Sequence, residues 1–216
     1  DMKNKEKLDL IRNTGVIAIM RANESDQLID AAQAIFEGGI RAIEVTLTTP
    51  GALKVISKVN EKFGDNILFG AGTVLDAESA LSAINVGAAF IVSPNLNLEV
   101  ITACLRYSIP VFPGCFTPTE IVTAWQSGAT MVKLFPSDVG GPAMIKAIRS
   151  PLPQVEIIPV GGVDLETTAD FIRNGASAVG VGGSLVNEKI LNTGEFSQLT
   201  DLAKKYLVEV GKGRAK

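Results

Sequence analysis

A lysine lies inside one of the most apolar stretches of the chain, Met131-Val132-Lys133-Leu134-Phe135-Pro136. A short apolar run that ends in a turn signal is typical of a buried strand in a parallel sheet. An ammonium ion in an apolar interior is costly unless it is paired or gives up its proton. A lysine that gives up its proton becomes a nucleophile for carbonyl compounds. The stretch therefore makes Lys133 a candidate nucleophile, around which the rest of the sequence could build a site.

The apolar run Ala42–Leu47 holds the other charged residue that we expect inside a strand core, Glu44. A carboxyl group close to the lysine could move protons during such chemistry. The structural alternative is a buried ion pair between Glu44 and Lys133 that only fills the interior. Buried pairs contribute little to stability, and apolar residues would fill the space as well. We therefore favour a catalytic role for Glu44.

The composition narrows the chemistry further. The chain has 216 residues, a net charge of −3 and no histidine, which excludes a Ser-His triad, an imidazole base and a His-ligated metal. Cys104 and Cys115 lack metal-ligand spacing and indicate free thiols in a reducing compartment. We expect no metal and no organic cofactor.

The same composition bears on partners and location. No basic surface for nucleic acid is indicated, and no apolar run approaches the roughly 18 residues of a membrane span. We see no signal peptide, so we expect a cytoplasmic protein that acts on a small molecule.

The elements around these residues alternate between apolar runs and segments of helical period. Eight such units predict an α/β protein with a closed (β/α)₈ TIM barrel, a single domain over residues 1–216. A short helix over residues 4–13 precedes it, and an amphipathic closing helix with Phe196, Leu199, Leu202, Tyr206 and Val210 follows. An open doubly wound sheet is the runner-up, but no Gly-x-Gly-x-x-Gly turn follows the first strand. The expected strands are Val16–Met20, Ala42–Leu47, Ile67–Val74, Phe90–Ser93, Val111–Pro113, Thr130–Phe135, Ile157–Val160 and Ala178–Gly182.

Helix starts and ends are also signalled. Thr117-Pro118-Thr119-Glu120 predicts a capping box, while Thr49-Pro50 and Asp164 predict two further helix starts. Helix ends are expected at Gly38-Gly39, Gly87, Gly128 and Gly175.

A barrel places its catalytic face at the carboxyl ends of the strands, and each interior layer comes from alternate strands. Glu44 and Lys133 belong to the second and sixth strands, so they are expected to share a layer. Arg21 ends the first strand and could bind a carboxylate, unless it is merely an exposed loop residue. Thr73 ends the third strand after Gly70 and Gly72, where a tight turn alone is the alternative.

The later loops supply the rest of the predicted site. Ser93-Pro94-Asn95 and Pro113-Gly114 are expected to shape the pocket walls. Gly161-Gly162 and Gly182-Gly183-Ser184 end the seventh and eighth strands, where barrels often bind phosphate through backbone N–H groups. Turn glycines without a ligand are the alternative reading.

Taken together, these segments resemble the class I 2-keto-3-deoxy-6-phosphogluconate (KDPG) and 4-hydroxy-2-oxoglutarate (KHG) aldolases over nearly the whole chain. The resemblance implies a homotrimeric barrel that cleaves the phosphorylated keto acid to pyruvate and glyceraldehyde 3-phosphate. It also implies Lys133 as the Schiff-base residue, Glu44 as the acid–base, contacts from Thr73 to the keto acid and Gly162, Gly183 and Ser184 around the phosphate. Pro94, Phe135, Gly161 and Gly182 complete the predicted substrate-binding set. The matching motifs are Glu44-Val45-Thr46-Leu47, Gly70-Ala71-Gly72-Thr73-Val74, Ser93-Pro94, Lys133-Leu134-Phe135-Pro136, Gly161-Gly162-Val163 and Gly182-Gly183-Ser184.

One residue departs from that family. Several members carry Arg where this chain has Thr48, and Arg21 is expected to supply the charge from the first strand instead. The alternatives are a 2-dehydro-3-deoxy-6-phosphogalactonate aldolase, a sugar-phosphate isomerase or synthase that uses Lys133 and Glu44 without a covalent bond, and a non-catalytic phosphate-binding barrel.

Overall fold

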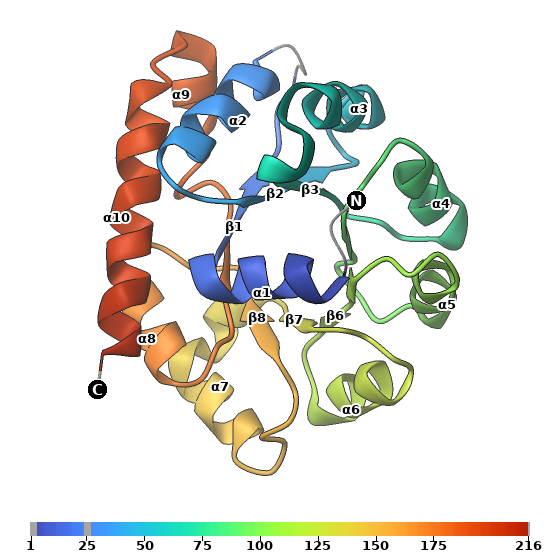
Figure 1. Cartoon of the computed structure of the whole chain (residues 1–216). Coiled ribbons are helices and arrows are strands. Elements are labelled where there is room, and N and C mark those ends of the chain that lie inside the picture. Colours follow the sequence, from blue (N-terminus) through green and yellow to red (C-terminus); the bar gives the residue numbers. More distant parts are fainter. Residues whose placement is uncertain (1–3, 24–26, 216) are drawn as a thin grey trace.

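Parallel strands curl into a barrel surrounded by helices (Figure 1). The computed structural model describes residues 4–23 and 27–215. Every ladder between named strands is parallel, as expected for strands joined by helical crossovers. The predicted α/β barrel is therefore confirmed. The strands are β1 Val16–Met20, β2 Ala42–Thr46, β3 Leu68–Gly72, β4 Ile91–Val92, β5 Val111–Phe112, β6 Gly114–Cys115, β7 Val132–Leu134, β8 Ile157–Pro159 and β9 Val179–Val181.

The barrel consists of two ladders, in the orders β5-β4-β3-β2-β1-β9 and β6-β7-β8. At one junction only Pro113 separates β5 from β6, because proline has no N–H group for the ladder. The Pro113 carbonyl still accepts a hydrogen bond from the Lys133 N–H at 3.0 Å. At the other junction a parallel bridge joins Val160 to Gly180. The single predicted run Val111–Pro113 therefore extends to Cys115 as two short strands.

The helices follow the predicted alternation. The first helix runs across one end of the barrel, and the last packs beside α2 and α8 (Figure 1). Both terminal helices of the prediction are confirmed. The helices are α1 Asn4–Thr14, α2 Leu28–Glu37, α3 Ala52–Phe63, α4 Ala77–Asn85, α5 Leu98–Arg106, α6 Pro118–Gln126, α7 Gly141–Arg149, α8 Thr168–Arg173, α9 Glu188–Thr193 and α10 Ser197–Arg214, with 3₁₀ turns at Gly64–Asn66 and Ser137–Val139.

The observed helix starts can be compared with the capping signals predicted from the sequence. Thr117 and Glu120 form the predicted capping box of α6. The prediction at Thr49-Pro50 is wrong, because α3 begins at Ala52 after a left-handed Gly51. The prediction at Asp164 is also wrong by several residues. Its side chain accepts hydrogen bonds from the N–H groups of Glu166 and Thr167, and this turn precedes the helix.

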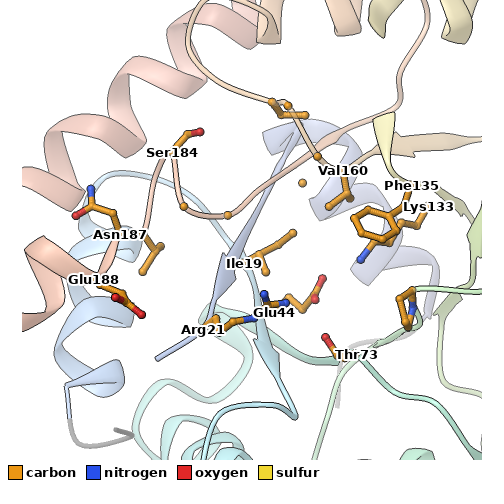
Figure 2. Close-up of a pocket in the computed structure, with 18 residues that line it drawn as sticks. Ile19, Arg21, Glu44, Thr73, Lys133, Phe135, Val160, Ser184, Asn187 and Glu188 are labelled. Carbon is orange, nitrogen blue, oxygen red and sulfur yellow. The ribbon is translucent and has the colours of Figure 1, made fainter. Parts of the chain in front are cut away.

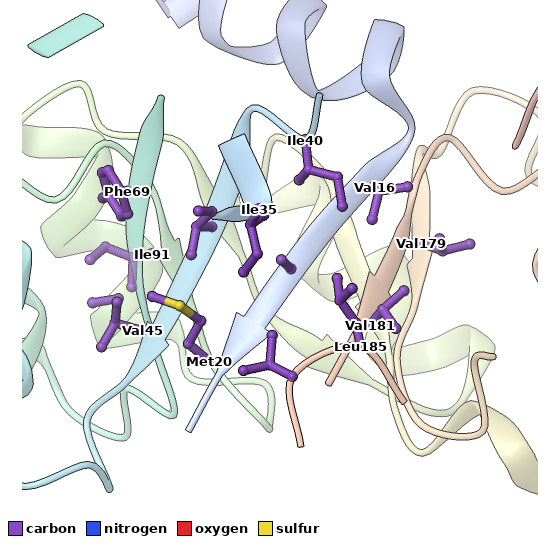
Figure 3. Close-up of a cluster of buried hydrophobic side chains, with 14 of the residues drawn as sticks. Val16, Met20, Ile35, Ile40, Val45, Phe69, Ile91, Val179, Val181 and Leu185 are labelled. Carbon is purple, nitrogen blue, oxygen red and sulfur yellow. The ribbon is translucent and has the colours of Figure 1, made fainter. Parts of the chain in front are cut away.

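Side chains on successive strand residues alternate between two apolar layers. The outer layer lies between the strands and the helices (Figure 3) and includes Val16, Met20, Val45 and Phe69. The inner layer fills the bore with Ile17, Leu68 and Phe90, and Leu8 and Ile11 of α1 belong to it. Since α1 closes the end where the strands begin, the opposite end is free to hold a pocket.

Candidate active site

A pocket of about 630 Å³ lies among the residues at the carboxyl ends of the strands. All eleven residues predicted from the sequence line it, which brings together segments from most of the chain. Figure 2 shows the side chains of the labelled residues among them, such as Arg21, Glu44 and Lys133, around one common space. The predicted residues in the lining are Arg21, Glu44, Thr73, Pro94, Lys133, Phe135, Gly161, Gly162, Gly182, Gly183 and Ser184.

Lys133 lies in the middle of β7, and its side chain enters the bore. Its neighbours Val132 and Leu134 belong to the outer apolar layer, so strand alternation directs Lys133 inward. The residue is 6% exposed. Its Nζ atom lies 4.9 Å from the centroid of the Phe135 ring, at the edge of the pocket. The amine is thus nearly enclosed yet reachable from the pocket.

Glu44 enters the same space from β2. It is 2% exposed, and it and Lys133 are the only buried charged residues in the described part of the chain. In Figure 2 the carboxylate and the amine point toward one another, with Arg21 beside Glu44. Burial raises the pKa of Glu44, while the charges of Lys133 and Arg21 oppose that rise. No direct ion pair joins Glu44 to Lys133, so the space between them is available to a reacting molecule.

Gly72 makes room for this carboxylate. A Cβ atom at Gly72 would lie 1.8 Å from Oε1 of Glu44. Gly72 therefore allows the close approach of Glu44, whereas Gly70 faces the ring of Phe90.

Arg21 follows β1 and is exposed at the pocket. The next residue is anchored, since the Ala22 N–H donates to the Thr49 hydroxyl at 3.2 Å. Thr46 bonds to the hydroxyls of Thr48 and Thr49. Thr49 therefore fixes the chain beside Arg21 instead of starting a helix, and Thr48 occupies part of the same hydroxyl cluster.

Thr73 has a left-handed backbone, with φ of 57°. This conformation is unusual for a β-branched residue, and such strain concentrates at functional positions. The side chain reaches toward the pocket beside Glu44 (Figure 2). Its placement suits a hydroxyl donor to a bound molecule.

The glycine loops form another wall. Gly161 and Gly162 have φ of 96° and 68°, and a Cβ at Gly162 would lie 2.5 Å from Cβ of Asp138. The positive φ at both positions favours glycine, and Gly162 also has no room for a Cβ. A Cβ at Gly182 or Gly183 would meet nothing within 4 Å, so those glycines leave open space beside Ser184.

Pro94 contributes to the wall as predicted, and Gly114 packs against its carbonyl group. Ser93 does not line the pocket. It is 1% exposed, and its hydroxyl has no hydrogen-bond partner among the described residues. Asn95, Pro113 and Gly114 are also outside the lining. Of the two segments predicted to shape the walls, only Pro94 therefore lines the pocket.

Seven lining residues were not predicted. The inward-facing ones could have been found by extending strand alternation from Glu44 and Lys133. Asn187 and Glu188 lie at the mouth and carried no sequence signal; Asn187 caps α9, and Glu188 accepts a hydrogen bond from Asn23 at 3.1 Å. The seven are Ile19, Val160, Val163, Gly180, Val186, Asn187 and Glu188.

No group of three or more Cys, Asp or Glu side chains is arranged to hold a metal ion in residues 4–23 and 27–215. No helix in those ranges is both long and apolar enough to cross a membrane.

Comparison with known proteins identifies the family. Residues 8–202 match the family model of KDPG and KHG aldolase. The chain is 36% identical over 208 residues to 2-dehydro-3-deoxy-phosphogluconate aldolase of Treponema pallidum (strain Nichols), covering 95% of this chain and 97% of that one. It is 37% identical over 171 residues to 2-dehydro-3-deoxy-6-phosphogalactonate aldolase of Escherichia coli (strain K12), covering 79% and 83%.

A solved KDPG aldolase from Legionella pneumophila, with pyruvate captured as a covalent carbinolamine, has a TM-score of 0.85 and 31% identity. The match covers 91% of this chain and 96% of that one. Fold, motifs and relatives agree, and the chain belongs to the KDPG and KHG aldolase family.

Proposed function

We propose that this protein is a class I, metal-independent aldolase that cleaves KDPG to pyruvate and glyceraldehyde 3-phosphate. The observation that carries this proposal is the pair of buried charged residues, Lys133 and Glu44, which face one pocket from opposite sides. The Legionella relative with its covalent pyruvate supports the same chemistry.

The reaction begins at Lys133. Its neutral amine adds to the C2 ketone of the substrate, and the carbinolamine loses water to form an iminium ion. The positive nitrogen then accepts the electron pair of the breaking C3–C4 bond. The near-complete burial of Lys133 keeps bulk water away from this intermediate.

Glu44 moves the protons. Its carboxylate, directly or through a water molecule, removes the C4 hydroxyl proton, and C3–C4 cleavage releases the aldehyde and leaves an enamine. Reprotonation at C3 gives the pyruvate imine, which water hydrolyses to pyruvate and free Lys133. The raised pKa of Glu44 supports this role, because a carboxylate whose pKa is raised is a stronger base and takes up the C4 hydroxyl proton more readily.

The remaining lining residues hold the two ends of the substrate. Arg21 and Thr73 are proposed to bind the keto acid carboxylate, since both lie beside Glu44. Gly161, Gly162 and the segment 182–184 are proposed to bind the phosphate through N–H groups and the Ser184 hydroxyl. Pro94 and Phe135 are proposed to form apolar walls.

A second candidate substrate is 2-dehydro-3-deoxy-6-phosphogalactonate, because a relative of that name is 37% identical over 171 residues, against 36% over 208 residues for the gluconate enzyme. A third is 4-hydroxy-2-oxoglutarate, cleaved to pyruvate and glyoxylate, since the matching family includes KHG aldolases. Pyruvate formation, coupled to lactate dehydrogenase, should be compared for all three substrates. The highest kcat/KM on KDPG supports the proposal. Higher efficiency on the galactonate would reassign the substrate within the same mechanism.

The assembly and location belong to the same proposal. We propose a homotrimer, supported by exposed apolar side chains on or near α5, and analytical ultracentrifugation would test it. These side chains are Leu75, Leu98, Leu105 and Tyr107. A cytoplasmic location agrees with two free, buried cysteines, Cys104 and Cys115, for which burial raises the pKa to about 12. Cell fractionation would test that location.

A further inference from the structure

Ser137 joins the strand that carries Lys133 to the loop that follows β8. It is 0% exposed and lies two residues beyond Phe135. Its N–H donates to the Val160 carbonyl at 2.9 Å, and its hydroxyl donates to the Gly161 carbonyl at 2.5 Å. One buried serine thus binds two consecutive carbonyl groups of the neighbouring loop.

The second bond fixes a peptide that could otherwise rotate. Gly161 and Gly162 both have positive φ, and glycine adopts either sign of φ with little penalty. In a planar trans peptide the carbonyl of Gly161 and the N–H of Gly162 point in opposite directions. Ser137 is not in the pocket lining, whereas both glycines are. The bond to Ser137 therefore turns the carbonyl away from the pocket and the N–H toward it.

Two backbone donors lie in the loop that follows β8. The N–H groups of Gly162 and Val163 have no hydrogen-bond acceptor among the described residues. The Gly162 carbonyl is also bound from outside the pocket, by the Thr167 hydroxyl at 3.1 Å. Successive backbone N–H groups of this kind form an anion-binding concavity.

We infer that Ser137 is a positioning residue, which holds the Gly161–Gly162 peptide so that its N–H faces the substrate phosphate. This inference rests on the phosphate site of the proposed function. Without the hydroxyl, the peptide can turn and present the Gly161 carbonyl oxygen to the phosphate, which would repel it. Because Ser137 follows Lys133 along the chain, the same segment positions both the nucleophile and the N–H group that donates a hydrogen bond to the phosphate.

The test compares Ser137→Ala with Ser93→Ala, another buried serine, whose hydroxyl has no hydrogen-bond partner among the described residues. Inorganic phosphate is titrated into each folded protein while the amide signal of Gly162 is followed by NMR. We expect Ser137→Ala to bind phosphate about 5- to 30-fold more weakly, the factor that corresponds to one lost buried hydrogen bond. Ser93→Ala should bind phosphate like the wild type.

Kinetics provide the second measurement. Ser137→Ala should raise KM for the phosphorylated substrate by a similar factor, with kcat little changed, and leave turnover of 4-hydroxy-2-oxoglutarate intact. Should Ser137→Ala fold poorly, Ser137→Cys keeps the volume with a weaker donor and should shift phosphate affinity in the same direction.

Unchanged phosphate affinity, or equal losses on both substrates, would overturn the inference. The phosphate titration does not depend on aldolase activity, so failure of the proposed reaction would be seen separately, as a wild-type protein that binds phosphate but forms no adduct with pyruvate.

Discussion

Gly72→Ala tests whether the position of the Glu44 carboxylate limits catalysis. The new Cβ would lie 1.8 Å from Oε1, so that oxygen must move by about 1.2 Å before the contact reaches 3.0 Å, the shortest that real Cβ atoms accept. A misplacement of about 1 Å at a reacting group costs about 10²-fold in rate. We therefore expect kcat for KDPG cleavage to fall by roughly 10²-fold. Gly72 does not have a positive φ, so alanine itself suits the backbone.

Gly70→Ala is the matched control. It lies two residues earlier on β3, where a Cβ would come within 2.3 Å of the Phe90 ring instead of the carboxylate. Both variants should unfold at lower temperature than the wild type, and both should still form the pyruvate adduct on Lys133. kcat should be measured well below both unfolding temperatures. A kcat for Gly72→Ala no lower than that of Gly70→Ala would refute this role of the Glu44 position.

Three further substitutions test the other roles. Glu44→Gln should lower kcat by roughly 10²–10⁴-fold, the range for a lost general acid–base. Burial raises the pKa of Glu44, so its ionisation destabilises the folded state as pH rises above the ordinary pKa of Glu. Thermal unfolding should therefore show that Glu44→Gln is more stable than the wild type at neutral pH, and this difference should disappear in acid. Arg21→Ala should raise KM for pyruvate in the condensation direction by roughly 10- to 150-fold, the loss of one charge-assisted bond. Adding Thr48→Arg should recover part of that loss, and unchanged pyruvate kinetics would refute the binding of the substrate carboxylate by Arg21. Gly183→Leu fills space that is open in the structure and should impair the phosphorylated substrate far more than 4-hydroxy-2-oxoglutarate, whereas equal losses would indicate a structural glycine.

The sequence was most informative where a residue violated the pattern around it. Lys133 and Glu44 stand out because each interrupts an apolar strand. They belong to the sixth and second predicted strands, and because alternate strands share a layer, both were expected to face the interior of the barrel. The glycine pairs were equally visible, since barrel topology fixes which loops follow the last two strands. The structure brings all of these residues to one pocket.

The missed features depend on contacts between distant segments. No local pattern tells that Gly72 makes room for Glu44, or that Ser137 binds the carbonyl of Gly161. Thr49 looked like a helix cap, yet its hydroxyl accepts a hydrogen bond from the N–H of Ala22, which follows β1. Side-chain hydrogen bonds of this kind are set by tertiary packing, which outweighs local capping preferences.

The central claim is that Lys133 is the covalent residue. The most direct measurement is reduction of the protein with borohydride in the presence of pyruvate, followed by intact mass and peptide mapping. We expect one reduced pyruvyl group on the peptide that contains Lys133, and none in a folded Lys133→Ala variant. An adduct on another lysine, or no adduct in an active wild-type enzyme, would contradict it.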